Sequence, residues 1–340
     1  MKELKKYLGF LGLLVILGSL SSCNKKQPAQ TVQRPAFSAD SAYAYIQTQM
    51  DFGPRVPNSA AHAQCALWLS EQLKSCGAEV SFQIGEMTDY RGHQQQVCNI
   101  IAHFSVPKYA NRPHILLGAH YDTRPWCDEE PLHADRMYNV PGANDGASGV
   151  GVLLEVARQL RFKIADTTLY TPVDIIFFDI EDMGTPSFYT GMERSDTWCL
   201  GSQLWATEYA NKANSQVRPA IANSQQYQYG LILDMIGDPN AVFPMEYYSS
   251  YYAEGYQQLI WRAAERLGYE KLFSKQLGYP IVDDHYYINY IAGIPCVDII
   301  HYDIHNNTGF PAWWHTRDDD MKHISKTTLQ AVGEVVMSLL

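Results

Sequence analysis

The sequence lacks the cysteine pairs, basic stripes and repeats that mark several large protein classes. None of its seven cysteines has the CxxC spacing of a structural zinc site. The formal net charge is −10 and no stripe of lysine or arginine is present, which argues against a nucleic-acid partner. No internal repeat, long low-complexity run or shift in composition divides the chain. With 46% hydrophobic residues, it is long enough for one large domain with a sizeable core.

The apolar segment near the N-terminus is too short and too broken by glycine to span a membrane comfortably. Residues 7–20 follow three lysines, a pattern typical of a secretory signal. Leu20-Ser-Ser-Cys23 resembles the bacterial lipoprotein signal; the alternative is an ordinary signal peptide with an incidental cysteine. We therefore predict a lipoprotein signal peptide over residues 1–22, a polar tether over 23–37 and a catalytic domain over 38–340. The chain is expected in the bacterial cell envelope, facing the periplasm and anchored through a lipid on Cys23.

Export would permit disulfides among the six cysteines that follow Cys23. Cys65 and Cys76 fall on one expected helix, about 16 Å apart along its axis, which is too far for a bond. The sequence does not pair the other cysteines, and we interpret them mainly as small core residues.

Hydrophobic patterns predict alternating strands and helices. Strands are expected at Val97–Phe104, Ile115–Ala119, Val173–Ile180, Gly230–Leu233 and Val297–Ile300. Helices are expected at Ser38–Met50, Ala60–Cys76, Ser148–Phe162, Ser202–Asn211, Tyr256–Leu267, Asp284–Ile291 and Thr327–Leu340. This alternation predicts a single-domain α/β fold whose mixed, mostly parallel central sheet is flanked by helices on both faces.

Acids and histidines follow the expected strands, where ligands of open α/β sheets bind. They are His120 and Asp122, the adjacent Glu181 and Asp182, Asp234, Asp145 in a glycine-rich loop, and His315 after two tryptophans. Each position alone is more typical of a solvated or hydrogen-bonded structural residue. Together, carboxylates and imidazoles at one sheet edge indicate a metal site, and zinc is the usual occupant of such a site.

This set, in this order, resembles the zinc-dependent aminopeptidase superfamily, which includes the animal-type glutaminyl cyclases. The resemblance extends from about Phe52 to the C-terminus. Two segments resemble the cyclases in particular: Phe310-Pro-Ala-Trp-Trp-His-Thr316, and Asp283-Asp-His285 followed by a helix and Gly293-Ile-Pro295.

The resemblance implies roles for individual residues. One Zn²⁺ per chain is expected on Asp145, Asp182 and His315. Glu181, Asp283 and Asp234 are expected to be catalytic, with Glu181 as the general acid and base. Trp314, Phe310, Trp198 and Asp298 are expected to form the substrate-binding part. His120 and Asp122 are expected either to support the ligands from behind or to hold a second metal.

The chain departs from the animal cyclases at three places. Asp182 stands where they have a glutamate, which shortens the ligand but keeps an oxygen donor. Ala119 replaces one half of a disulfide, and Asp298 replaces a histidine of the hydrogen-bond network. The run Asp318–Asp320 we interpret as solvated loop charges.

The implied function is a glutaminyl-peptide cyclotransferase that converts the N-terminal glutamine of exported peptides and proteins to pyroglutamate and releases ammonia. The alternative is a two-zinc aminopeptidase that uses the same residues to release N-terminal residues. A receptor with a decayed site is disfavoured, because every expected ligand and base position holds a competent residue. We expect N-terminal glutamine peptides as substrates, a monomer, and no nucleic-acid partner.

Overall fold

The structure is a computed structural model and describes residues 34–192, 194–214, 226–302 and 309–340. The expected signal peptide, Cys23 and most of the tether lie outside these ranges. Within the described ranges, no helix is both long enough and apolar enough to cross a membrane.

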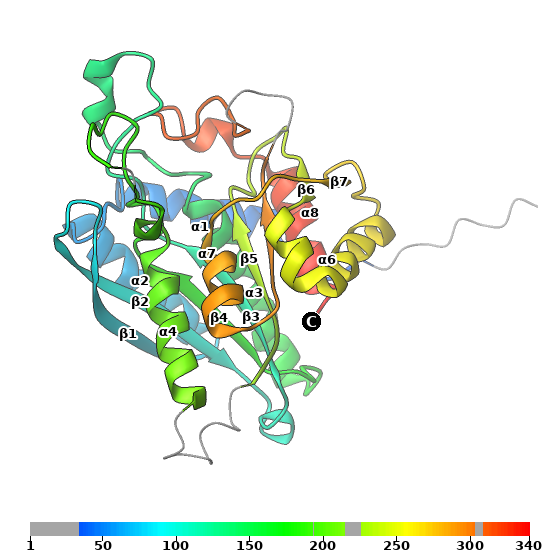
Figure 1. Cartoon of the computed structure of the whole chain (residues 1–340). Coiled ribbons are helices and arrows are strands. Elements are labelled where there is room, and N and C mark those ends of the chain that lie inside the picture. The colour runs from blue at the N-terminus through cyan, green and yellow to red at the C-terminus, as the bar shows by residue number, and fades with distance from the viewer. Residues whose placement is uncertain (1–33, 193, 215–225, 303–308) are drawn as a thin grey trace, which may run out of the picture. The chain divides into compact units, whose positions relative to one another are not determined.

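A six-stranded mixed sheet forms the centre of the molecule, in the order β1-β2-β4-β3-β5-β8 (Figure 1). Its strands are β1 (Glu79–Thr88), β2 (Gln94–Phe104), β3 (His114–His120), β4 (Val173–Phe178), β5 (Tyr227–Asp234) and β8 (Cys296–Ile300). The four strands from β4 to β8 run parallel, whereas β1 and β2 pair antiparallel at one side. A small second sheet pairs β6 (Phe243–Met245) with β7 (Phe273–Leu277).

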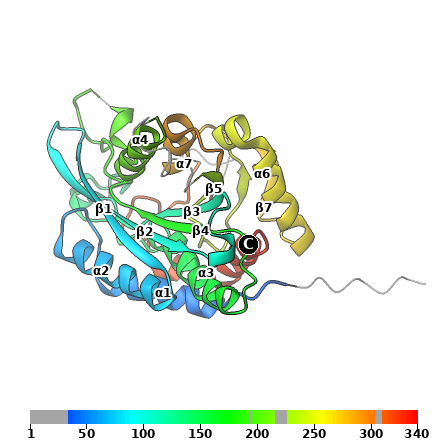
Figure 2. The same ribbon diagram turned by 90° about the horizontal axis from the view of Figure 1, so that it is seen from below.

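Helices cover both faces of the sheet. They are α1 (Ala39–Asp51), α2 (Ala60–Ser75), α3 (Ala147–Ala165), α4 (Leu200–Asn214), α6 (Tyr247–Leu267), α7 (Asp284–Tyr287) with the π-helix η4 (Ile288–Ala292), and α8 (Lys326–Met337). Short 3-10 turns lie at Pro107–Tyr109, His133–Met137, Ser195–Thr197 and Met321–His323. Helices α1, α2 and α3 lie on one face of the sheet, and α4 and α7 lie on the other (Figure 2). The predicted fold class is confirmed.

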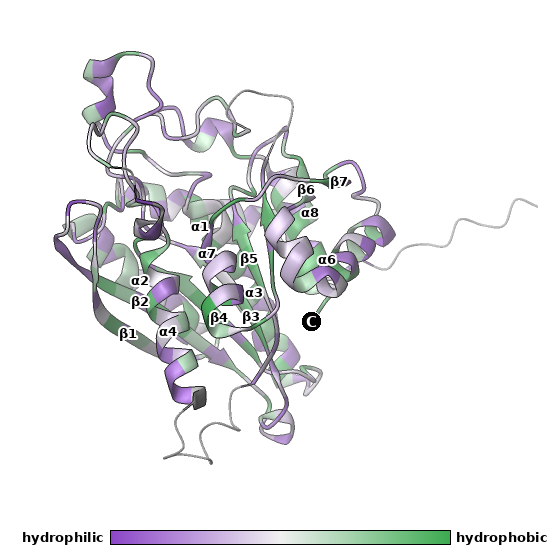
Figure 3. Ribbon diagram, in the orientation of Figure 1, coloured by the Kyte–Doolittle hydropathy of each residue, from purple (hydrophilic) through white to green (hydrophobic). Residues whose placement is uncertain are grey.

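The parallel strands are apolar because they are covered on both sides. Every residue of β3 and β4 is buried, and two hydrophobic clusters occupy the two faces. Figure 3 shows the hydrophobic residues concentrated in these central strands, with polar residues on the outer helices and loops. None of the six cysteines in the described part is in a disulfide, and five of them are buried.

Three differences from the predictions have a clear physical reason. Strand β1 was not predicted, because it is a sheet edge with mixed, half-exposed residues. Helix α6 begins at Tyr247 rather than Tyr256, because Glu246 caps it by accepting hydrogen bonds from the backbone of Tyr248 and Ser249. The compact unit begins at Arg34, four residues before the predicted boundary, since the Arg34 guanidinium binds Glu334 at 2.6 Å.

Candidate metal centre and its pocket

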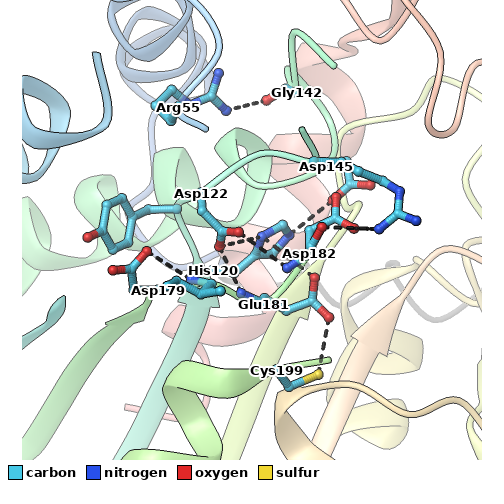
Figure 4. Close-up of polar contacts among 12 residues, drawn as sticks. Arg55, His120, Asp122, Gly142, Asp145, Asp179, Glu181, Asp182 and Cys199 are labelled. Carbon is cyan, nitrogen blue, oxygen red and sulfur yellow. Dashed lines mark hydrogen bonds and ion pairs between the residues drawn. The ribbon is translucent and has the colours of Figure 1, made fainter. Parts of the chain in front are cut away.

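The carboxyl ends of the parallel strands bring the expected residues together (Figure 4). Strand β3 ends at His120 and β5 ends at Asp234, while Glu181 and Asp182 follow β4. Asp145 lies just before α3, where Gly146 adopts a φ of +95° and Gly149 passes close to β5. A Cβ atom at Gly149 would lie 2.2 Å from the carbonyl oxygen of Leu233, so a side chain there would push the helix away.

One donor set consists of Asp145, Asp182 and His315, the expected zinc ligands. The Nε2 atom of His315 lies 3.2 Å from Asp182 Oδ1 and 3.5 Å from Asp145 Oδ2. One donor atom from each of the three buried residues lies within 4.8 Å of the other two. A histidine with two carboxylates is a donor set that zinc accepts.

A second donor set consists of His120, Asp145 and Asp234. The Nε2 atom of His120 lies 3.1 Å from Asp145 Oδ1 and 3.2 Å from Asp234 Oδ1. These donor atoms also lie within 4.8 Å of one another. The two sets share Asp145, so the chain has the residues for one metal ion or for two bridged by this carboxylate.

The buried charges fit a cation. Oδ2 of Asp182 is buried and has no hydrogen-bond partner. Burial, reinforced by Asp145, raises the pKa of Asp182. Burial likewise raises the pKa of Asp234 to about 7, although the hydrogen bond from His120 opposes this shift. Carboxylates gathered in a buried space repel one another until a cation joins them, so these residues suit a bound divalent metal.

An arginine and an aspartate support the first donor set from behind. The guanidinium of Arg124 donates two 2.6 Å hydrogen bonds to Asp128 and reaches Asp182 Oδ1 at 3.3 Å. Asp128 in turn faces Nδ1 of His315 at 3.5 Å. A carboxylate behind a metal-binding histidine fixes the orientation of the ring. Neither Arg124 nor Asp128 was predicted.

Two further carboxylates hold the backbone of the ligands. Asp122, one of the expected supporting residues, accepts hydrogen bonds from the backbone N–H groups of Glu181 and Asp182 at 3.0 and 3.2 Å. Asp319 accepts from the N–H groups of Asn144 and Asp145 at 2.8 and 3.0 Å. The interpretation of Asp319 as a solvated charge is therefore wrong, since it is 1% exposed.

Backbone strain gathers at this centre. Among the described residues, six other than glycine have a positive φ, and four of them lie here: Ile180, Cys199, Met235 and His315, with φ between 48° and 55°. This conformation is unusual for residues other than glycine, above all for the β-branched Ile180. Such strain persists where surrounding contacts hold a functional geometry.

A pocket of about 390 Å³ opens beside the first donor set. Three aromatic side chains that were expected to bind substrate line it: Trp198, Phe310 and Trp314. Trp314 stacks on His315 with ring centroids 3.6 Å apart, and Trp198 faces the same imidazole at 6.4 Å. The aromatic walls therefore lie against a ligand of the candidate metal.

Glu181 reaches the same pocket and has acidic neighbours. Its side chain is 13% exposed, and burial raises its pKa well above the ordinary range. Asp234 and Asp283 also line the pocket. Asp298 is fully buried behind Asp283 and is not among the lining residues, so any part it takes in substrate binding is indirect. Its other neighbour is His285, whose Nδ1 lies 3.4 Å away.

The fold and this centre define a class of α/β enzyme that holds a metal on carboxylates and histidine at the carboxyl edge of its sheet. The model of peptidase family M28 matches residues 99–340. The chain belongs to this family, which implies zinc as the metal.

Similar proteins are named either glutaminyl cyclases or peptidases. The glutaminyl-peptide cyclotransferase of Bos taurus is 26% identical over 243 residues, which are 66% of this chain and 60% of the bovine protein. The crystal structure of Tannerella forsythia glutaminyl cyclase is 43% identical, with a TM-score of 0.81 over 90% of this chain and 98% of that one. A Zn-dependent exopeptidase from Parabacteroides distasonis is also 43% identical, with a TM-score of 0.81 over 90% of this chain and 99% of that one.

Proposed function

We propose that the protein is a zinc-dependent glutaminyl-peptide cyclotransferase, acting on the N-terminal glutamine of peptides and proteins. The observation that carries the proposal is the aromatic pocket, which places Glu181 beside the buried set of Asp145, Asp182 and His315. Similarity to the bovine and Tannerella forsythia cyclases supports it.

In this proposal, Asp145, Asp182 and His315 hold one zinc ion. When bound, zinc supplies a Lewis acid that polarises the side-chain amide of the substrate. Trp198, Phe310 and Trp314 hold the glutamine side chain and limit the access of water.

The ring closes within the substrate. The α-amine attacks the side-chain carbonyl carbon, the new C–N bond closes a five-membered lactam, and the bond to the amide nitrogen breaks. The substrate supplies proximity, so the protein has to hold the folded conformer and move protons. Glu181 takes the proton that the amine loses and gives it to the departing nitrogen, which leaves as ammonia. Asp234 and Asp283 lie beside Glu181 on the pocket wall and face the incoming amine.

A two-zinc aminopeptidase is the second candidate, because the second donor set of His120, Asp145 and Asp234 is complete. A peptidase would use this second donor set, since a second metal there would help to activate the water that attacks the peptide bond. A cyclase needs none, because the nucleophile is part of the substrate.

The purified protein should be incubated with matched peptides that begin with glutamine or alanine, and followed by mass spectrometry. We expect loss of ammonia from the glutamine peptide, no change in the alanine peptide, and about one zinc per chain. Replacing His315 by alanine should remove the zinc, whereas His120→Ala should leave its content nearly unchanged. Two tightly bound zinc ions, with release of free N-terminal residues and no ammonia, would refute the cyclase.

We also propose that the protein is a monomer in the bacterial cell envelope, anchored through a lipid on Cys23 and facing the periplasm. The lipoprotein-like Leu20-Ser-Ser-Cys23 supports this location. A mature N-terminus at Cys23 with an acyl mass is expected, and Cys23→Ser should abolish it. Cleavage well downstream without lipid would exclude the anchor.

A further inference from the structure

The thiol of Cys199 lies directly against Glu181. Its Sγ atom is 3.1 Å from Oε1 of Glu181, so the S–H group can donate a hydrogen bond to this carboxylate oxygen (Figure 4). The cysteine is fully buried, forms no disulfide, and does not line the pocket. It therefore contacts the expected acid–base residue without itself being part of the pocket wall.

The backbone of Cys199 holds the same residue. Its N–H group donates to the carbonyl oxygen of Glu181 at 2.8 Å, and the next N–H group, of Leu200, donates to Ile180 at 2.9 Å. On the other side, the N–H group of Glu181 donates to Asp122. Glu181 is thus fixed at its N–H, its carbonyl and one carboxylate oxygen, and Cys199 makes two of these three contacts.

Two residues next to this contact, Cys199 itself and Ile180 before Glu181, have an unfavourable backbone conformation. The φ of Cys199 is +55° and that of Ile180 is +50°. The strained position at Cys199 follows Trp198, whose indole faces His315. Two adjacent residues thus face the centre: Trp198 presents its indole to His315, and Cys199 presents its thiol to Glu181. This double placement would account for the strain.

We propose that Cys199 is a positioning residue for Glu181, an inference that rests on the proposed cyclase function. Its thiol holds Oε1 and fixes the carboxylate rotamer, which leaves Oε2, 4.0 Å from Nδ1 of His120, to take the proton of the substrate amine. A thiol is an uncharged and weak donor, so it orients the carboxylate without competing strongly for the proton that the amine delivers. Because the thiol never meets the substrate, its loss should affect turnover rather than binding.

The test compares Cys199→Ala, Cys199→Ser and Cys76→Ala. The last removes a buried thiol at the end of α2, away from the centre, and serves as the control. Alanine keeps the Cβ atom and hence the same backbone strain, so the change removes the hydrogen bond together with the packing of the sulfur, and the control accounts for the packing. We expect kcat of Cys199→Ala to fall about tenfold, the size expected for one lost hydrogen bond that orients an acid–base group. KM, zinc content and the thermal midpoint should match the control.

The serine variant supplies a rescue, because its hydroxyl donates from the same position. We expect it to recover kcat to within about threefold of the unmodified protein. A hydroxyl is a stronger donor than a thiol, which favours recovery, but its shorter bond to Cβ leaves it farther from Glu181, which keeps recovery incomplete. A purely structural cysteine would give no such rescue. Equal kcat values for Cys199→Ala and Cys76→Ala, or a loss that appears in KM or zinc content instead, would overturn the proposal.

A second measurement does not depend on cyclase activity. The infrared S–H stretching band of Cys199 is identified as the one lost in Cys199→Ala. It should move to higher wavenumber in Glu181→Gln, because an amide accepts the hydrogen bond more weakly than a carboxylate. An unmoved band would overturn the contact even in an active enzyme. A shifted band in a protein that cyclises no glutamine peptide would instead refute the proposed function.

Discussion

Removing the charge of Asp128 should weaken zinc binding although Asp128 is not a ligand. The Asp128 carboxylate lies between Arg124 and His315, and hydrogen bonds from these two residues hold its pKa well below the ordinary range in spite of burial. It is therefore charged at every working pH. Replacing Asp128 by asparagine keeps the shape and one acceptor oxygen, but it removes the charge that orients the imidazole of His315.

The size of the effect follows from the contacts. Loss of a carboxylate behind a metal-binding histidine lowers metal affinity by about 10- to 100-fold, or about 1.4 to 2.8 kcal/mol. Asp128→Ala should cost more in folding stability, about 3 to 5 kcal/mol, because it leaves the buried Arg124 guanidinium without its main partner. Zinc affinity is measured by competition with a chromophoric chelator, and stability by denaturant unfolding of the zinc-free protein.

The matched control is Asp196→Asn. Asp196 makes the same two-armed contact with Arg194, at 3.1 and 2.9 Å, but on the exposed surface. Its loss should leave zinc affinity unchanged, since exposed pairs contribute little. The reasoning would be refuted if Asp128→Asn bound zinc within about twofold of the unmodified protein while His315→Ala lost zinc.

Three further outcomes are expected. Glu181→Gln should lower kcat for cyclisation by at least about 100-fold with zinc retained, because the amide cannot take the proton of the amine; near-normal turnover would exclude its role. Asp298→Asn should keep more activity than Asp298→Ala, because the amide preserves a polar partner beside Asp283; equal and negligible losses would place Asp298 outside the network. Asp174 is buried, yet hydrogen bonds from His103 and His114 lower its pKa to about 2. Its contribution of about 2 to 3 kcal/mol is thus present above pH 4 and lost as pH falls toward 2; acid unfolding of Asp174→Asn should lack this part of the pH dependence.

The sequence predicted the centre well because of a regularity of parallel sheets. His120 and Asp234 end strands and Asp182 follows one, and parallel strands present their carboxyl ends at one edge. Long apolar runs predict buried strands. Predicting these strands therefore also predicted that the residues after them lie together at the carboxyl edge of the sheet. His315 lies in a loop that no strand pattern could place, and only the resemblance to the cyclases implied that it is a zinc ligand.

The sequence analysis missed charged residues that are buried by contacts with residues far away in the sequence. Asp318 and Asp319 are neighbours, yet only Asp319 turns inward, because two N–H groups some 175 residues earlier need an acceptor. Arg124 and Asp128 form a pair of opposite charges four residues apart, which in a sequence is typical of a solvated surface. The spacing could have suggested a pair, but not its burial, to which distant Trp198 contributes with a ring that lies 4.7 Å from the guanidinium.

The distribution of charge around the pocket favours a substrate amine over a second metal. A peptide N-terminus has a pKa of about 7.7 to 8.0, so it arrives largely as a cation. Asp234, Asp283 and Glu181 line the pocket together, and burial raises the pKa of Asp234 to about 7 and that of Glu181 well above its usual range. A raised pKa makes the ionised form of a carboxyl group a stronger base for an ammonium proton than an ordinary carboxylate. A second dication on His120 and Asp234 would occupy the same carboxylate and lower its affinity for protons. Under the proposed cyclase function, Asp234 would therefore serve better beside the substrate amine than as a ligand of a second metal.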